Sequence, residues 1–372
     1  MFGSSLVSSH RNEDAGYWRG LLRALHSSGH RISFYEPDAF GRQQHRDLAG
    51  DPDYARVVVY AAGVSGLSRA LHDASHADVV IKTSGVGVFD RELEESVLAL
   101  REHGRAVVYW DLDAIATLRR LHLDAEDYFR PLVSEYDLVL ARGAGESVAR
   151  AYELAGARRC ISTDPGVDPD EHRPAPIDPR FEGALGYLGP RLAERDGGVS
   201  AFFFGAARSL PGERFLLGGD GWRGIPDAPA NVLVVGHVHS ADRDAFCGTP
   251  RGLLCFGAED VPRLGPASMQ QLLEAASAGA CLFTDRWQRL ERMFEPDREC
   301  VVVRDGAELA ARLRELTPEA AALTGARARR RVLEQHTYER RGQEVGRALL
   351  EAVSRRPRAV DPASAVASTA RW

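Results

Sequence analysis

The chain has 372 residues, 44% of them hydrophobic and 27% charged, a composition typical of globular proteins and a length that favours two domains. Its formal net charge of -6 at pH 7 argues against a nucleic-acid partner, because nucleic-acid-binding proteins usually carry a basic excess. No apolar run approaches the ~20 residues that cross a bilayer, so we expect no transmembrane segment.

The first half of the chain alternates apolar runs with helical patterns. We predict helices at 16–30, 91–104, 116–123 and 146–156, and strands at 31–38, 77–84, 105–113 and 137–143. The strands are apolar on both faces, as in a parallel sheet covered by helices. The first apolar strand has barely begun at MFGSSL, so we expect a misassigned start codon with a few strand residues upstream.

Five prolines between 165 and 179 exclude a central strand or a helix interior there and predict a domain linker. The alternation then restarts, with apolar segments at 183–189, 214–219, 231–238, 252–258, 280–285 and 299–305. The final helical stretch, 317–353, is predicted to break near His336 and Thr337, and residues 357–372 are predicted to be disordered. Two successive doubly wound α/β domains are therefore the predicted architecture.

The five cysteines are odd in number and have no CxxC spacing. We interpret them as buried thiols of a reducing compartment and expect a cytoplasmic protein.

Ligands of open α/β sheets bind beyond the carboxyl ends of the strands, so polar residues directly after strands are the candidates for chemistry. The loop SSHRNEDAG leads into a helix, where exposed N–H groups favour an anion or a polar substrate. His10 is either a general base or a surface histidine. Asn12 and Glu13 are candidate cleft residues, although Glu13, like Asp14, is also suited to cap the helix.

The segment KTSGVGVFD contains a GxG but lacks the third glycine of a dinucleotide fingerprint, so a tight turn before a helix explains it equally well. Lys82, Ser84 and Gly85 are candidate cleft residues in this segment. Lys82 is either a phosphate or carboxylate partner or a structural lysine.

Asp111 and Asp113 follow a buried strand and resemble a metal-binding DxD pair. We expect no metal here, favour Asp111 as a residue that orients the substrate or acts as a base, and count Asp113 among the candidate acceptor or cleft residues. His237 and His239 are spaced for one face of a strand end, but without an evident third ligand we interpret His237 as lining a nucleotide pocket.

Taken together, segments such as FGSSLVSS, ADVVIKTSGVGVFD, YWDLDA, VDPDEHRP, EAASAGACLFTD and VLEQHTYERR resemble the GT-B fold glycosyltransferases. Over nearly all of residues 2–350 the similarity is to the bacterial branch named after the spore-maturation protein CgeB, which is related to glycosyltransferase group 1.

The resemblance implies two Rossmann-like doubly wound domains facing a cleft, with acceptor binding at 1–168 and nucleotide-sugar binding at 169–335. It also implies that a helix at 336–356 crosses back to the first domain. In the family the carboxylate at Glu274 accepts hydrogen bonds from the ribose of the nucleotide. The remaining residues expected at the donor site are Arg251, Arg263, His237, Asp285 and Ser268.

Three departures from the family pattern are Gln271, Cys255 and Ala258, which stand where relatives have Arg or Asn. Losing a guanidinium removes a bidentate phosphate partner, a role that Arg251 and Arg263 remain to fill.

The expected function is therefore a metal-independent, hexosyltransferase-type glycosyltransferase that moves a sugar from a nucleotide-diphosphate donor to a small-molecule or glycan acceptor, without a cofactor. His10 or Asp111 is the expected base if the reaction inverts the anomeric carbon. Two alternatives stay open. One is a catalytically degenerate GT-B protein that binds a nucleotide, glycan or partner enzyme, and the other is a sugar-nucleotide epimerase.

Overall fold

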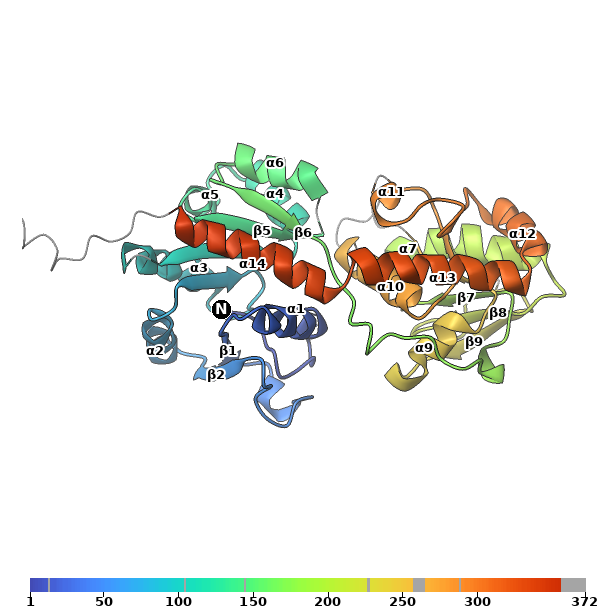
Figure 1. Ribbon diagram of the computed structural model, residues 1–372, viewed down its shortest axis with the longest axis horizontal. Coiled ribbons are helices and arrows are strands. Elements are labelled where there is room, and N and C mark those ends of the chain that lie inside the picture. The colour runs from blue at the N-terminus through green and yellow to red at the C-terminus, as the bar shows by residue number, and fades with distance from the viewer. Residues whose placement is uncertain are drawn as a thin grey trace, which may run out of the picture. The chain divides into compact units, whose positions relative to one another are not determined.

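The computed structural model describes residues 1–12, 14–103, 105–143, 145–225, 228–256, 265–287 and 289–355. The chain forms two compact units (Figure 1). The first unit comprises Met1–Asp164 and the C-terminal segment from Arg341, and the second comprises Pro165–Arg340. The boundary expected after residue 168 thus falls at 164, and the tail predicted at 357–372 lies outside the described residues.

The first unit is built on strands that all run parallel. The strands are β1 (Ser33–Asp38), β2 (Arg56–Ala61), β3 (Val79–Thr83), β4 (Ala106–Asp111), β5 (Leu138–Arg142) and β6 (Cys160–Thr163). The helices are α1 (Ala15–Ser27), η1 (Arg42–Gln44), α2 (Val64–Ala74), α3 (Asp90–Ala99), η2 (Leu100–His103), α4 (Ala114–Leu123), α5 (Arg130–Val133), α6 (Gly145–Leu154) and α14 (Tyr338–Ser354).

Phe2 joins the two parts of this sheet. The β1–β2 pair and the β3–β6 group are separate ladders, but Phe2 forms parallel bridges to Tyr35 of β1 and to Lys82 of β3. The backbone N–H of Phe2 donates to the Ile81 carbonyl, and that of Gly3 donates to the Tyr35 carbonyl. The spatial order is therefore β2, β1, Phe2, β3, β4, β5, β6.

Successive residues of β4 point to opposite faces, as a strand period of two requires. Val107 and Tyr109 pack in an apolar cluster with residues of α2, α3 and α4. Trp110 packs edge-on against Trp18 of α1, with ring centroids 5.1 Å apart. Both faces of the sheet are covered by helices, which is why its strands are apolar throughout.

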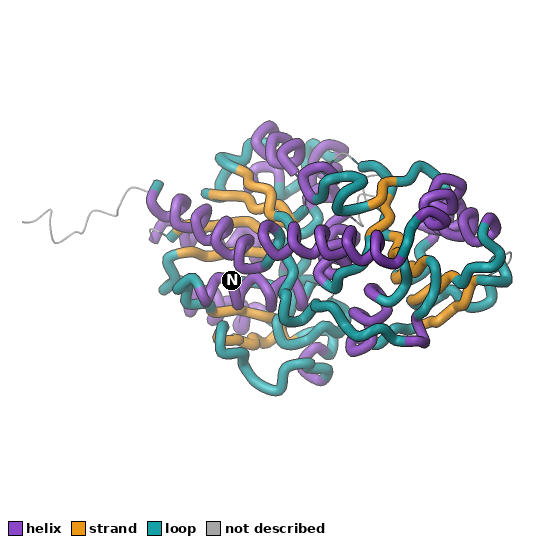
Figure 2. The backbone as a smooth tube through the Cα atoms, turned by 45° about the vertical axis from the view of Figure 1, so that its right-hand side comes forward, coloured by secondary structure: helices purple, strands orange, loops and turns teal. Residues whose placement is uncertain are grey.

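The second unit contains another parallel sheet (Figure 2). Its strands are β7 (Leu185–Leu188), β8 (Phe215–Gly218), β9 (Val232–Gly236), β10 (Gly252–Leu254), β11 (Leu282–Thr284) and β12 (Val301–Val302). Its helices are η3 (Pro179–Phe181), α7 (Ala193–Gly198), the π-helical η4 (Val199–Phe204), α8 (Gly205–Ser209), α9 (Ser240–Gly248), α10 (Gly265–Ser277), α11 (Leu290–Met293), α12 (Gly306–Glu315) and α13 (Pro318–Gln335).

The strand order of this sheet is β12-β11-β10-β7-β8-β9. Leu216 of β8 packs in the cluster that contains α9 and α10, whereas its neighbours Phe215 and Leu217 pack with η4, α8 and α12. The order and the two apolar faces are those of a doubly wound Rossmann-like sheet. The predicted α/β class with parallel sheets is therefore confirmed.

The sequence analysis missed two strands of the first unit, β2 and β6, and the helices α2 and α5. In β2, RVVVYA, Val58 is half-buried and Val59 is exposed on the edge of the sheet. The break predicted near His336 is observed, because α13 ends at Gln335 and α14 begins at Tyr338.

Helix α14 packs on the first unit. Gly342 lies against Ala24 of α1, and Arg159 pairs with Glu351 at 2.6 Å. Within the described ranges, no helix is long and apolar enough to cross a membrane.

The contact between α14 and α1 yields a stability prediction. A Cβ at Gly342 would stand 2.8 Å from the Cβ of Ala24, too close for a van der Waals contact. We expect Gly342→Ala to lower the free energy of unfolding by about 1–3 kcal/mol, as overpacked sites do. Gly16 of α1 has no atom within 4 Å of such a Cβ, so Gly16→Ala should cause no loss. Thermal unfolding of both variants checks this, and equal midpoints would contradict the packing.

Candidate functional site

Each sheet has one point where the strand order reverses, and crevices for ligands form there, beyond the carboxyl ends of the strands. In the first unit this point lies between Phe2 and β3, so the loops 3–12 and 84–89 flank it. In the second unit it lies between β7 and β10, which places Gly189 and Cys255 at its rim. The candidate site is built from these loops in each unit.

Asn12 shapes the first of these loops from the inside. Its buried amide donates to the carbonyls of Ser5 and Ser8 at 2.7 and 2.9 Å and accepts from the Ser4 hydroxyl at 2.8 Å. Because these bonds engage both ends of the amide, Asn12 holds the loop in shape and does not present its side chain to a ligand.

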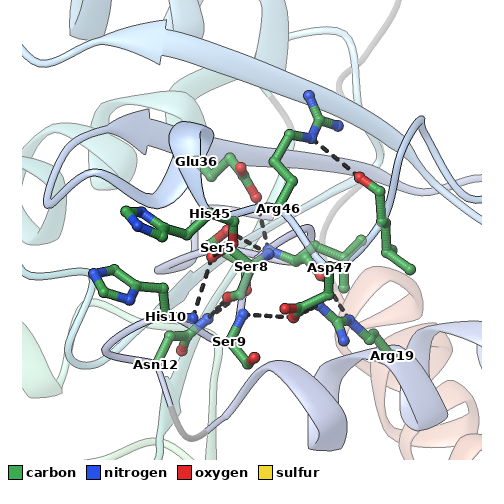
Figure 3. A network of polar contacts seen from close by, with 12 residues as sticks. Ser5, Ser8, Ser9, His10, Asn12, Arg19, Glu36, His45, Arg46 and Asp47 are labelled. Atoms are coloured by element: carbon green, nitrogen blue, oxygen red, sulfur yellow. Dashed lines mark hydrogen bonds and ion pairs between the residues drawn. The ribbon is translucent and has the colours of Figure 1, made fainter.

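His10 and a second histidine, His45, stack at this loop (Figure 3). Their ring centroids are 4.2 Å apart with an interplanar angle of 16°. The Ser8 hydroxyl accepts a hydrogen bond from the backbone N–H of His10 at 3.2 Å and donates one to the backbone carbonyl of His45 at 2.5 Å. One hydroxyl thus fixes both backbones, and it places two imidazoles side by side at the switch point of the first sheet.

Glu36 and Arg42 hold this loop through hydrogen bonds to its backbone. Glu36 is fully buried and accepts from the Leu6 N–H and from the Gln43 amide, both at 2.6 Å. The buried guanidinium of Arg42 donates to the carbonyls of Ser4 at 3.0 Å and Arg11 at 3.2 Å. These charge-assisted bonds hold the loop in one conformation.

Lys82 is a structural residue in this fold. Its ammonium is fully buried and lies 2.7 Å from Asp90 and 3.4 Å from Glu94, and it also donates to the Thr83 carbonyl. Asp90 in turn accepts from the backbone N–H groups of Val86 and Gly87. Burial raises the pKa of Glu94 although Lys82 lowers it. Of the two interpretations of Lys82, its placement agrees with the structural one.

Ser84 and Gly85 form the turn that follows β3. The Ser84 hydroxyl accepts from the Leu112 N–H at 2.8 Å, which links this turn to the end of β4. Gly85 has a φ of 69°, a left-handed conformation that favours glycine.

The aspartates after β4 serve the protein itself. Asp111 is fully buried, accepts from the Asp113 N–H at 3.0 Å and receives a short hydrogen bond from the Tyr152 hydroxyl. Burial, and next the Asp111 charge, raise the pKa of Tyr152 well above its ordinary value. Asp113 caps α4 by accepting from the Ala116 N–H. The Asp111 carboxylate is therefore engaged internally through both oxygens, whereas the exposed Asp113 uses one oxygen as a helix cap.

In the second unit, Glu274 of α10 lies in a charged cluster and is 14% exposed. Its Oε2 is 2.6 Å from Arg243 of α9, and its Oε1 accepts from Gln270 at 2.8 Å. The same Oε1 lies 3.7 Å from His172 Nε2, a linker residue whose Nδ1 is 3.3 Å from Asp244. Arg243 stands in the first turn of α9, just beyond the carboxyl end of β9.

Gln271 and Arg251 occupy different ends of the second sheet. The Gln271 amide donates a short bond to the carbonyl of Leu188, the last residue of β7. Arg251 precedes β10 and pairs with Glu213 at 2.8 Å. This places Arg251 at the amino end of its strand, away from the carboxyl ends where ligands bind, so the structure does not bring it to the expected donor site.

His237 and Asp285 do follow strands. His237, after β9, is exposed and lies 3.7 Å from Asp220, with its ring 4.9 Å from that of His239. Asp285, after β11, accepts from the Thr284 hydroxyl. Glu13, Arg263 and the side chain of Ser268 lie outside the described residues. Within the described part of the chain, no three His, Cys, Asp or Glu residues gather as a metal site.

Sequence reasoning missed His45, His172 and Arg243. Each stands far in sequence from its partner, so no local spacing pointed to it. The only available signal was the position of His172 in the linker and of Arg243 in a first helical turn after a strand.

A family model matches within the second unit and the start of α14. Residues 195–346 match the family model described as "Glycosyl transferase-like". No curated protein sequence matches the chain.

Three solved structures share the fold over most of their length. HepE of Anabaena, in complex with UDP-glucose, is 13% identical, with a TM-score of 0.57 over 89% of this chain and 94% of that one. Sucrose-phosphate synthase from Thermosynechococcus elongatus is 14% identical, with a TM-score of 0.62 over 92% and 94%. AviGT4, a glycosyltransferase involved in avilamycin A biosynthesis, is 16% identical, with a TM-score of 0.55 over 90% and 88%.

At these identities the likeness shows the fold, which is the two-domain α/β fold of the GT-B glycosyltransferases. The family match adds that most of the second unit carries a glycosyltransferase-like sequence pattern.

The burial of Lys82 leads to a second prediction. Lys82→Met leaves two carboxylates without their cation, so we expect the free energy of unfolding to fall by about 3–5 kcal/mol. Adding Glu94→Gln removes one uncompensated charge and should recover part of the loss. The control is Arg91→Met, which breaks an exposed pair with Glu95 in the same helix and should leave the midpoint of denaturant unfolding almost unchanged. Equal midpoints for Lys82→Met and wild type would refute the role.

Proposed function

We propose that this protein is a glycosyltransferase that moves a sugar from a nucleotide-diphosphate donor to a hydroxyl of a small-molecule or glycan acceptor. The proposal depends mainly on one observation in the second unit. The residues that match the glycosyltransferase-like family model form most of its doubly wound sheet and helices. The structural likeness to HepE bound to UDP-glucose supports a nucleotide sugar as the donor. We further place the chain in the CgeB-like branch and assign it a hexosyl donor.

On the donor side, we assign Glu274 to the ribose of the nucleotide. A partly exposed carboxylate on the helix that follows β10 is an acceptor suited to sugar hydroxyls. Asp285 follows the carboxyl end of β11 and His237 that of β9, on opposite sides of the switch point, and we assign both to the donor side as well. Gln271, bonded to the end of β7, fixes the approach of α10 to that strand.

On the acceptor side, we assign the base to His10 for an inverting reaction. Between the two candidates, His10 is partly exposed on a loop at the switch point, whereas Asp111 is fully buried and engaged by Tyr152. In this proposal His10 takes the proton of the acceptor hydroxyl as that oxygen attacks the anomeric carbon and the nucleoside diphosphate leaves. Asp111 positions the end of β4.

We also propose that the reaction does not depend on a divalent metal. The support is the internal use of Asp111, whose two carboxylate oxygens accept from the Tyr152 hydroxyl and the Asp113 N–H, while one oxygen of Asp113 caps α4. A cytoplasmic location is proposed on the five buried cysteine thiols.

A second candidate function is a protein of the same fold that binds its ligand without turnover. The observation that favours it is the state of Glu274, whose carboxylate already contacts Arg243 and Gln270, together with Gln271 in place of an arginine.

Nucleotide binding tests the donor assignment. We expect one of UDP, dTDP, GDP, ADP or CDP, with or without Mg²⁺, to raise the unfolding midpoint, because a ligand at ~100 times its Kd stabilises the native state by roughly 2.7 kcal/mol. Glu274→Ala should weaken that nucleotide by about 1.5–3 kcal/mol through lost charged hydrogen bonds.

Two variants control this experiment. Glu274→Gln keeps the size of the side chain and should also bind more weakly, whereas Glu315→Ala, an exposed glutamate of the same unit, should bind as wild type. If no nucleotide changes the midpoint, the donor assignment is wrong. If the affinity of Glu274→Ala equals that of wild type, Glu274 is not in the site.

Turnover tests the base. His10→Ala should lower kcat by roughly 10²–10⁴-fold while leaving nucleotide affinity unchanged, the usual contribution of a general base. His26→Ala, an exposed histidine of α1, is the control. The measurement is the rate of donor consumption by both variants. An unchanged kcat for His10→Ala would exclude His10 as the base.

A further inference from the structure

His172 is held more firmly than most linker residues. Its Nδ1 lies 3.3 Å from Asp244, its carbonyl accepts from the Ser277 hydroxyl at 2.6 Å, and the next N–H, that of Arg173, donates to Asp244 at 3.0 Å. The imidazole is therefore fixed against α9 and α10, with Nε2 directed at Glu274.

The hydrogen bond to Asp244 sets the tautomer of the neutral ring. A carboxylate only accepts, so the proton of neutral His172 resides on Nδ1. Nε2 is then a bare acceptor, and it faces a second acceptor, Oε1 of Glu274, at 3.7 Å. When the ring is neutral, neither of these two atoms carries a proton, so no hydrogen bond forms between them.

The rest of the Glu274 carboxylate is already used. Arg243 covers Oε2 at 2.6 Å, and Gln270 takes one acceptor position of Oε1. The position that remains on Oε1 is the one beside His172. Two neighbouring acceptors fixed by the fold match a ligand that carries two neighbouring hydroxyl donors, and the ribose of a nucleotide has such a pair.

We propose that His172 is a specificity-determining residue of the donor site, where neutral Nε2 and Glu274 Oε1 each accept a hydrogen bond from one of the two adjacent ribose hydroxyls. Arg243 is the positioning residue that holds the carboxylate for this. The inference rests on the proposed function, because it takes a nucleotide as the ligand of Glu274.

Protonation of His172 removes this acceptor pair. The imidazolium donates from Nε2 to Glu274, so the ribose and the proton compete. Burial lowers the pKa of His172, but the bond to Asp244 and the charge of Glu274 outweigh it, so the pKa is raised above the ordinary value of a histidine. Ribonucleotide affinity is therefore low at acidic pH, rises with pH through the His172 pKa, and levels off above it.

The charges around the ring come from three helices and the linker. Helix α9 contributes Asp244 and Arg243, and α10 contributes Glu274. From α13, Arg329 donates to the carbonyl of Ser277 beside the ring. The linker adds Arg173, Glu171 and Asp170. Of these groups, His172 is the one whose ordinary pKa lies in the range of the experiment.

The test measures the affinities of UDP and 2′-deoxy-UDP by calorimetry between pH 6.0 and 8.5. Both ligands carry the same diphosphate, so the ratio of their affinities cancels the ionisation of the phosphates. We expect the wild type to prefer UDP by roughly 3- to 10-fold at pH 8.5, the worth of one hydrogen bond. The preference should shrink as the pH falls to 6.0.

Two variants separate the ring from its surroundings. His172→Asn keeps a donor for Asp244 but removes Nε2, so the preference for UDP should be small at every pH. His172→Gln offers an amide oxygen near the position of Nε2 and cannot be protonated, so its preference should be retained at pH 6.0. Unfolding midpoints equal to that of wild type show that both variants fold.

The outcomes are distinct. If wild type binds UDP, but the ratio is independent of pH or the same in His172→Asn, the role of His172 is overturned while the donor assignment stands. If wild type binds dTDP but no ribonucleoside diphosphate, the role of His172 is overturned while the proposed function stands. If it binds none of UDP, dTDP, GDP, ADP and CDP, the proposed function fails and the inference fails with it.

Discussion

The order of the parallel strands is the constraint on which the candidate site depends. In each unit the chain begins the sheet in its middle, builds to one side and then returns to build the other, so one crevice opens between the first strand and its later neighbour. In the first unit this first strand is reduced to the bridges of Phe2, yet it still directs the loop with His10 to the switch point. In the second unit β10 leads into α10, the helix that carries Glu274, from the corresponding place.

Charged residues at these strand ends fall into two groups. Lys82, Asp111 and Arg42 are buried, and their charged groups form hydrogen bonds or ion pairs with neighbouring segments. Their role is to hold the backbone in place. Because an unpaired buried charge is costly, such residues occur with partners that the fold supplies. His10, Glu274 and His172 keep part of their surface accessible. This difference in burial separates residues that shape the site from residues that can meet a ligand.

The linker between the units supplies one member of the cluster around Glu274. Its prolines exclude regular structure, which lets residues 168–173 follow the surface of α9 and α10 and bring an imidazole to a carboxylate about a hundred residues away in sequence. Arg243 and Gln270 fix the same carboxylate from other sides. The donor assignment and the role of His172 thus depend on one cluster in which each member limits the protonation or orientation of the next.

The sequence by itself determined the α/β class, the two sheets, the break before α14 and the segments after strands where ligands bind, because these follow from hydrophobic period, proline and glycine. It missed the edge strands β2 and β6, and in β2 the exposed Val59 hides the alternation of faces. It left Lys82 open between two roles and placed Arg251 at the donor site, whereas the strand direction puts Arg251 at the opposite end of β10. The partners His45, Arg243 and His172 were decided only by the tertiary structure, since contacts between residues distant in sequence leave no local pattern.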